Sequence, residues 1–186
     1  IGAIRCRIDQ DCPCCAVIKP ITLLSTMPLH LPDESATRAL GAALAPFIEP
    51  GCIIYLSGQL GGGKTTFVRG LLAGFGHTDK VKSPTFSLVE PYVLSRLNFY
   101  HFDLYRIKTP EEWDDSGFRE YFDGQSISLI EWPEKALARL PGADLWLTFT
   151  VTQTGRDVSI EAATERGNRC RLQLERSLPP NVSCAS

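Results

Sequence analysis

The sequence predicts a single α/β domain with a mainly parallel central sheet flanked by helices. Two kinds of pattern support this. Short runs bounded by turn residues, continuously apolar at 52–56 and mainly apolar at 127–131, are typical of strands buried in a parallel sheet. Segments with helical character alternate with these runs, and this alternation is typical of a parallel sheet whose strands are connected by helices. A length of 186 residues favours one domain, and 44% hydrophobic residues is ordinary for a globular protein.

The first helix is expected to begin between residues 33 and 37 and to end near Ala45. Asp33 or Ser35 can cap it, because a short polar side chain accepts hydrogen bonds from the free amides of the first turn. Periodicity and turn residues predict the remaining elements. In order, these are a strand at 52–56, a helix at 65–73, an extended segment at 86–92, a strand at 98–103, a helix from Pro110, a strand at 127–131, a short helix at 133–140, and a C-terminal antiparallel strand pair at 145–151 and 158–162 turned at Thr154 and Gly155.

Residues 58–65 match the pattern G-x-x-x-x-G-K-[ST] at every fixed position, between a predicted strand and a predicted helix. Glycines allow successive amides to point at one anion, at the positive end of the following helix. Lys64 would reach the β- and γ-phosphates, and the Thr65 hydroxyl would ligate Mg²⁺. The pattern therefore predicts a P-loop NTPase. Because no Asn-Lys-x-Asp guanine-reading motif occurs, ATP is favoured over GTP.

Such an enzyme also needs an acid at the tip of a neighbouring strand. Asp103 and Glu131 each end a predicted strand, and spacing does not choose between them. Both are expected at one edge of the sheet, because ligands of parallel sheets bind at the carboxyl ends of the strands. Thr85 has the type and position of a switch residue that senses the γ-phosphate, although a turn threonine is an equally good interpretation. His101 and Trp132 flank the acids, where such side chains more often pack than react.

The composition changes at Met27, the only methionine. Residues 1–26 contain four of the seven cysteines and no periodic apolar pattern. We expect residues 1–26 to be a non-native or mis-annotated extension, residues 27–177 to form the P-loop ATPase domain, and residues 178–186 to form a disordered tail. A small metal-binding appendage is the alternative for the extension, but its cysteines lack the two separated pairs of a zinc site.

Charge and hydropathy limit the classes of partner. The net charge of −2 does not favour a free-standing nucleic-acid binder, whose domain would usually be basic. If RNA is involved, we expect a partner to hold it. No apolar stretch is long enough to cross a bilayer, and no secretory signal is recognisable, so we expect a cytoplasmic protein that has no membrane partner.

Four segments in this order and spacing resemble the TsaE family, bacterial ATPases of tRNA threonylcarbamoyladenosine biosynthesis. The P-loop alone would be generic, whereas the four together are specific. The resemblance covers about residues 31–162. The segments are 60–67 with the P-loop, 81–92 with Ser83-Pro84-Thr85, 100–106 with His101-Phe102-Asp103-Leu104-Tyr105-Arg106, and 129–134 with Glu131-Trp132-Pro133.

The resemblance implies an activity and partners that spacing does not reveal. TsaE-like proteins act with a complex of TsaB and TsaD. That complex transfers a threonylcarbamoyl group to the adenosine beside the anticodon, on tRNAs that read codons beginning with A. The TsaE-like subunit binds the complex, hydrolyses ATP and resets the complex between turnovers. Contact with tRNA would therefore be indirect.

The resemblance also implies roles for individual residues. Thr65 and Glu131 would ligate Mg²⁺, and Lys64, Asp103 and Glu131 would form the catalytic set, with Asp103 at the γ-phosphate. Asp33 or Glu34 would also approach the nucleotide. The nucleotide-binding residues would be Gly61, Gly62, Gly63, Lys64, Thr65, Thr66, Thr85, Asp103, Trp132 and Arg156.

Two positions depart from the family pattern. Gln59 stands where the family usually has an acid, and Gly62 stands where it usually has alanine. Gln59 removes one negative charge near the phosphates, and Gly62 adds backbone freedom worth about 0.5–1 kcal/mol. Neither change removes a required group.

Two other functions remain open from the sequence. A small-molecule kinase would need a second substrate pocket, and the missing arginine-rich lid after the P-loop helix weakens that interpretation. An ATP-gated binding module with negligible hydrolysis would tolerate loss of Asp103, whereas an ATPase would not. No arginine stands out as an arginine finger in cis, so we expect slow hydrolysis by the isolated protein.

Overall fold

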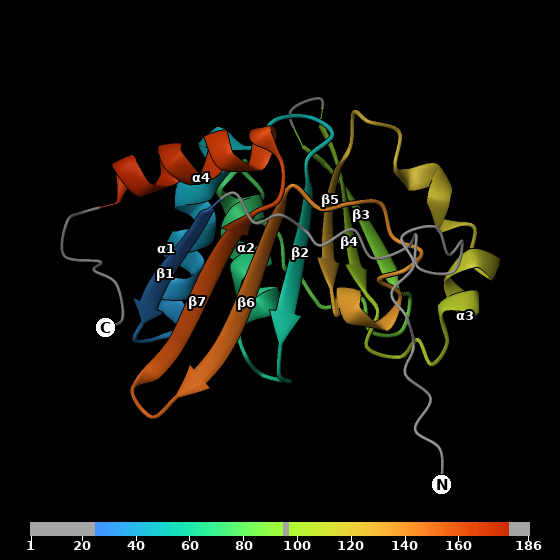
Figure 1. Ribbon diagram of the computed structural model, residues 1–186, viewed down its shortest axis with the longest axis horizontal. Helices are drawn as coiled ribbons and strands as arrows, with labels where there is room; N and C mark the ends of the chain where they lie inside the picture. Colours follow the sequence, from blue (N-terminus) through green and yellow to red (C-terminus); the bar gives the residue numbers. More distant parts are fainter. Residues whose placement is uncertain (1–24, 95–96, 179–186) are drawn as a thin grey trace, which may run out of the picture.

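The computed structural model describes residues 25–94 and 97–178. One seven-stranded sheet forms its centre, with strand order β1-β7-β6-β2-β5-β4-β3 (Figure 1). The elements are β1 Ser25–Leu31, α1 Glu34–Leu44, the 3₁₀ helix η1 Ala45–Phe47, β2 Ile53–Gly58, α2 Lys64–Gly74, β3 Val89–Leu94, β4 Leu97–Asp103, α3 Pro110–Asp115, η2 Phe118–Tyr121, β5 Ile127–Glu131, η3 Pro133–Lys135, β6 Leu145–Thr152, β7 Gly155–Ala162 and α4 Glu165–Ser177.

The middle of the sheet is parallel and its two sides are antiparallel. β2 pairs in parallel with β5 and β6, and β4 pairs in parallel with β5. β1–β7, β7–β6 and β3–β4 are antiparallel pairs. The predicted α/β fold with a parallel centre and a C-terminal antiparallel pair is confirmed. The antiparallel additions of β1 and β3 at the edges are new. The carboxyl ends of the four parallel strands meet at one edge, where ligands bind in sheets of this type.

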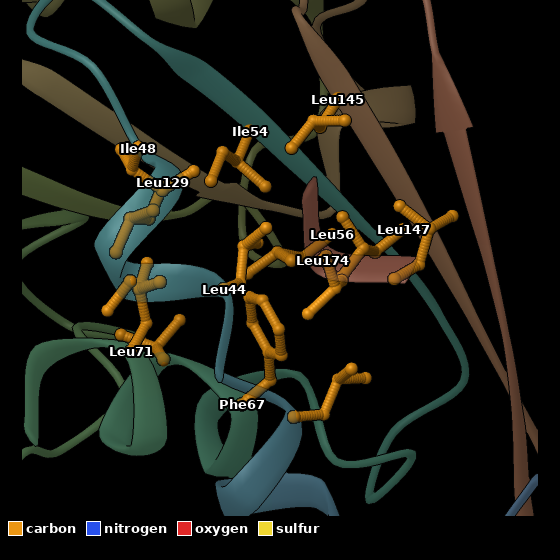
Figure 2. Packing of buried hydrophobic residues seen from close by; sticks show 14 of the residues in the cluster. Leu44, Ile48, Ile54, Leu56, Phe67, Leu71, Leu129, Leu145, Leu147 and Leu174 are labelled. Atoms are coloured by element: carbon orange, nitrogen blue, oxygen red, sulfur yellow. The ribbon is translucent and has the colours of Figure 1, made fainter. Parts of the chain in front are cut away.

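Helices α1 and α2 cover one face of the sheet and lie behind it in Figure 1. Leu44 of α1 and Phe67 of α2 are fully buried between the helices and the sheet. Ile54 and Leu56 of β2 belong to the same cluster and are also fully buried (Figure 2). Leu174 of α4 completes the same cluster. Burying a side chain of this size contributes roughly 1.5–3 kcal/mol, so this layer supplies much of the stability of the domain.

The opposite face has its own apolar cluster. Tyr55 of β2 and Phe102 of β4 belong to this cluster. Trp113 of α3 and Phe118 of η2 pack against Phe102. Alternate residues of a strand face opposite sides of a sheet. Both faces are therefore covered at β2, β4 and β5, which explains why the sequences of β2 and β5 are mainly apolar and do not alternate between apolar and polar residues.

Two helices approach each other so closely that only glycine fits at the crossing. A Cβ on Gly41 of α1 would collide with the carbonyl oxygen of Phe67, and one on Gly70 of α2 would collide with that of Arg38. The backbones of α1 and α2 are thus in direct contact. This contact fixes α2, and with it the residues at its N-terminus, relative to the rest of the molecule.

Polar caps join the elements at their ends. Asp33 caps α1 as predicted, because its Oδ1 accepts a hydrogen bond from the amide of Ala36 at 2.7 Å. Asp144, before β6, connects two elements: its Oδ2 accepts from the amide of Ile53 at 3.0 Å and its Oδ1 accepts from the hydroxyl of Thr164 at 2.5 Å. Thr164 is the N-cap of α4, so one carboxylate joins the starts of β2 and α4.

Some predicted boundaries were wrong. β1 begins at Ser25, two residues before the expected start of the domain, while residues 1–24 and the tail 179–186 lie outside the described residues. Residues 86–88 are not extended, since they belong to a turn that the amide of Leu88 closes on the carbonyl of Pro84 at 2.7 Å. The predicted helix at 133–140 is only the 3₁₀ helix Pro133–Lys135, because Ala136 leaves the helical conformation.

None of the helices within residues 25–94 and 97–178 combines the length and the apolar character that crossing a membrane requires.

Candidate nucleotide-binding site

The P-loop connects β2 to α2 at the carboxyl edge of the parallel strands. Gly61 and Gly63 have φ of 75° and 107°, in the left-handed region that favours glycine. Such a backbone turns successive amides toward one point, which is the geometry of an anion-binding nest. Gly63 is also the N-cap of α2, so the positive end of the helix dipole faces the same point.

Lys64 lies inside the loop and is only 4% exposed. Its Nζ donates hydrogen bonds to the carbonyl oxygens of Gly58 at 2.7 Å and Gln59 at 2.9 Å. Burial lowers the pKa of Lys64, and the carboxylates of Glu131, Glu134 and Asp103 partly oppose that shift. The ammonium is therefore a desolvated cation held by neutral oxygens, which phosphate oxygens could replace with a stronger, charge-assisted interaction.

Trp132 covers the ammonium of Lys64, with Nζ 3.9 Å from the ring centroid. It follows β5 directly and has φ of 59°, which is uncommon for a residue with a side chain. Tyr105 packs beside the indole, with ring centroids 5.0 Å apart. Strained conformations of this kind persist where the surrounding structure fixes them, and they are frequent at functional sites.

Asp103 and Glu131 end neighbouring strands and are register partners of β4 and β5. Each is 3% exposed. Oε1 of Glu131 accepts a hydrogen bond from the Thr65 hydroxyl at 2.7 Å and lies 2.9 Å from Nε2 of His101. The fold therefore brings both candidate acids to the P-loop, and spacing could not choose between them because both belong to the site.

Asp103 is held by the loop that precedes β3. Its Oδ2 accepts hydrogen bonds from the hydroxyls of Thr85, at 2.7 Å, and Ser83. Its Oδ1 accepts from the amide of Tyr105 at 3.0 Å. The amide of Asp103 donates to the carbonyl of Leu88 at 3.0 Å, so the turn and the strand end are joined on both sides.

A cavity of about 360 Å³ lies between the P-loop, the two strand-end acids and the loop that precedes β3. Of the predicted site residues, Arg156 and the alternatives Asp33 and Glu34 are absent from its wall. The guanidinium of Arg156 lies against Gly63, where an added Cβ would meet it, and its Nε is buried without a partner among the described residues. The lining residues are Leu60, Gly61, Gly62, Gly63, Lys64, Thr65, Thr66, Arg69, Ser83, Thr85, Asp103, Tyr105, Glu131 and Trp132.

Sequence reasoning assigned no role to four residues of this cavity, namely Leu60, Arg69, Ser83 and Tyr105. Ser83 had a usable signal, because it lies two residues before Thr85 in the same loop. Arg69 had no such signal, because an arginine inside a helix is usually interpreted as a solvent-facing residue. In the structure, its Nε donates a hydrogen bond to the carbonyl of Val81 at 2.9 Å.

Within the described ranges, no three or more His, Cys, Asp or Glu side chains gather as a metal cage. The oxygen donors that line the cavity beside the P-loop include the Thr65 hydroxyl and the carboxylates of Asp103 and Glu131. Mg²⁺ is typically bound by one or two carboxylates together with substrate phosphates and waters, and this donor set fits that mode.

Comparison with protein families matches most of this chain to one family model. Residues 31–158 match the family model described as "Threonylcarbamoyl adenosine biosynthesis protein TsaE". The chain is 40% identical over 149 residues to the tRNA threonylcarbamoyladenosine biosynthesis protein TsaE of Haemophilus influenzae, spanning 77% of this chain and 94% of that protein. It is 38% identical over 144 residues to the protein of the same name in Bacillus subtilis, spanning 77% and 87%.

A solved structure agrees. The crystal structure of Bacillus subtilis YdiB superposes with a TM-score of 0.70 and 29% sequence identity, covering 82% of this chain and 95% of that one. The likeness therefore extends over nearly the whole length of that structure.

Proposed function

The chain belongs to the TsaE family of tRNA threonylcarbamoyladenosine biosynthesis proteins, and we propose that in this pathway it is a Mg²⁺-dependent ATPase. The observation that carries the proposal is the meeting of Lys64 and Thr65 of the P-loop with Asp103 and Glu131 in one cavity. A nest of amides, a desolvated lysine and two strand-end carboxylates are the groups that phosphoryl transfer to water requires.

Binding of ATP would exchange partners within the site. The amides of residues 61–66 would hold the phosphates, and Lys64 would release the carbonyls of Gly58 and Gln59 to contact the β- and γ-phosphates. Thr65 and Glu131 would hold Mg²⁺, which neutralises phosphate charge when bound. Trp132 and Arg156 flank the loop and would contact the nucleotide from either side.

Hydrolysis would depend on Asp103. Its Oδ2 is occupied by the hydroxyls of Thr85 and Ser83, so these must turn away before the carboxylate can orient the attacking water. Thr85 would then be free to contact the γ-phosphate, as a switch residue does. Slow turnover in isolation follows, because the uncomplexed protein keeps Asp103 tied to the loop.

We propose that the TsaB–TsaD complex is the partner, and that tRNA is contacted through it. Two observations support a protein partner at the site. Leu60 is 72% exposed and Phe86 is 88% exposed, one on the P-loop and the other beside Thr85. Large apolar side chains exposed at a cavity mouth are typical of surfaces that a partner covers, and a chain of net charge −2 is not suited to holding RNA alone.

The test measures phosphate release from ATP with Mg²⁺, with and without TsaB–TsaD and tRNA. We expect the partners to raise the rate. Lys64→Ala should abolish ATP binding, whereas Asp103→Asn should lower kcat roughly 100-fold or more with binding retained, since a group needed only in the transition state is lost. Lys135→Ala and Asp115→Asn make the same charge changes at exposed positions and should behave as wild type.

Two results would overturn the proposal. Phosphate appearing on an acceptor other than water would identify a small-molecule kinase. Multiple-turnover tRNA modification that survives Asp103→Asn would identify a nucleotide-gated binding module instead of an ATPase.

A further inference from the structure

His101 lies in β4, which β5 separates from the P-loop strand β2, and its side chain contacts Glu131 of the nucleotide site. Its register partner on β5 is Leu129, two residues before Glu131. Diagonal neighbours on one face of a sheet are within reach of long side chains. This position explains how a residue without exposure, at 0%, contacts a carboxylate that lines the cavity.

The hydrogen bonds around the imidazole define its tautomer. Nε2 lies 2.9 Å from Oε1 of Glu131, and a carboxylate oxygen can only accept, so Nε2 carries a proton. Nδ1 is buried and has no partner within residues 25–94 and 97–178. A proton on Nδ1 would be a buried donor without an acceptor, which is costly. The Nε2–H tautomer satisfies the ring with the fewest unpaired groups.

The carboxylate of Glu131 is held on one side only. Oε1 accepts both hydrogen bonds, from Thr65 and from His101, whereas the described residues give Oε2 none. The Thr65 hydroxyl has one proton and two lone pairs, so it can donate to Glu131 and still offer a lone pair to a cation. Two donors on one oxygen fix the plane of the carboxylate and leave the other oxygen free.

We propose that His101 is a positioning residue of the Mg²⁺ site: its Nε2–H holds Oε1 of Glu131, so that Oε2 and the Thr65 hydroxyl stay aimed at the metal. This inference rests on the proposed function and extends it to a residue that does not touch nucleotide. Groups that orient a metal-binding carboxylate typically change metal affinity 10–100-fold when removed. A histidine that only packed in the core would influence stability alone.

The test compares His101→Leu, which removes the donor, with His101→Gln, whose amide N–H can take the place of Nε2–H. The readouts are Mg²⁺ affinity by titration calorimetry with a non-hydrolysable ATP analogue, nucleotide binding without metal, and the melting temperature. We expect His101→Leu to weaken Mg²⁺ binding about 10–100-fold with metal-free nucleotide binding unchanged, and His101→Gln to restore most of the affinity.

Phe99→Leu is the matched control, because Phe99 is fully buried two residues earlier on the same face of β4 and packs against Phe75. It should lower the melting temperature without altering Mg²⁺ affinity. Equal Mg²⁺ affinity for wild type and a folded His101→Leu would overturn the inference. So would failure of His101→Gln to rescue a variant that had lost affinity.

A spectroscopic measurement tests the inference without any variant. Long-range ¹H–¹⁵N spectra of the ¹⁵N-histidine-labelled wild-type protein should show His101 protonated at Nε2 and not at Nδ1. The opposite tautomer would overturn the inference. Wild-type protein that binds the ATP analogue with no dependence on Mg²⁺ would instead contradict the proposed function, so the two failures are distinguishable.

Discussion

Under the proposed function, the charged side chains of the site have partners that a ligand would replace. Lys64 donates to two backbone carbonyls and lies under Trp132, and Asp103 accepts from two hydroxyls of its own loop. Each contact satisfies a buried charge at little cost and can be exchanged for a phosphate oxygen or a water. The geometry is that of a site at rest.

Trp132 should report occupation of the site. Nucleotide phosphates would draw the Lys64 ammonium away from the indole, so the emission of Trp132 should change when ATP and Mg²⁺ are added. Trp132→Phe should abolish this change and shift the affinity by no more than about two- to fivefold, because the cation–π contact of about 0.5–1 kcal/mol belongs to the free protein and is given up when nucleotide binds. Titrations followed by tryptophan fluorescence give both values.

Trp146→Phe is the matched control for that experiment. Trp146 lies on β6 away from the cavity, and its Nε1 donates to the hydroxyl of Ser57 at 2.8 Å. The variant should keep the nucleotide-dependent change. A change that persists in Trp132→Phe and vanishes in Trp146→Phe would contradict the assignment.

The sequence predicts the candidate site best where chemistry restricts residue type. The P-loop requires glycines, a lysine and a hydroxyl at fixed spacing, and strand-end acids such as Asp103 are recognisable once strands are predicted. Sequence reasoning interpreted His101 as a packing residue, because its partner, Glu131, comes from another strand 30 residues later in the chain. Partnerships of this kind depend on register, which a single sequence does not specify.

At the scale of elements, the crossing of α1 and α2 leaves no room for an added side chain. Gly41→Ala should lower the free energy of unfolding by about 1–3 kcal/mol, because the added methyl collides with backbone and not with a movable side chain. The gain in helix propensity, about 1 kcal/mol, offsets this loss only in part. Urea denaturation monitored by circular dichroism measures the difference.

Gly142→Ala provides the comparison. An added Cβ there meets no atom within 4 Å, so its effect should stay within about 0.5 kcal/mol. Gly41→Ala as stable as Gly142→Ala would mean that the two helices can separate without loss, contrary to the contact described above.

The elements that sequence reasoning missed are those that tertiary contacts create. The sequence of β1 resembles an irregular domain start and contains Pro28. The segment becomes a strand because it pairs with β7 along its whole length. Such a proline is tolerated at the sheet edge, where β1 lies. α4 is largely polar and shows a helix only through its cap, Thr164, and the buried positions Cys170 and Leu174. In contrast, β2 and β5 are mainly apolar and buried, and both were predicted almost to the residue.

At the scale of the whole molecule, two buried thiols report whether the core is closed. Cys52 and Cys170 are fully buried, and burial raises the pKa of both. We expect alkylation of these two cysteines at pH 8 to proceed only through unfolding, so that their labelling rate falls in step with rising stability. Peptide mass spectrometry resolves them from other cysteines, with denatured protein as the fully labelled reference.

The same thiols make stability depend on pH. A thiol pKa raised by folding contributes stability below the unfolded value of about 8.5, and that contribution is lost as pH rises toward the folded value. The urea midpoint should therefore fall between pH 8 and pH 9.5. The fall should be smaller in a Cys52→Ala, Cys170→Ala double variant, and an equal fall in both proteins would rule out the thiols as the cause.

The order of strands has a consequence for synthesis on the ribosome. β2, which leads into the P-loop, is flanked by β5 and β6, and Ile53 at its start bonds to Asp144, 91 residues later. The hydrogen-bond partner of His30 in β1 is Asp157, which lies 127 residues later in the chain. At about 5–20 residues per second, the nascent P-loop strand spends several seconds with both of its edges unpaired. The P-loop is translated early, but its strand can pair on both edges only after β6 has left the exit tunnel, so a chain stopped before β6 would be a substrate for chaperones and proteases.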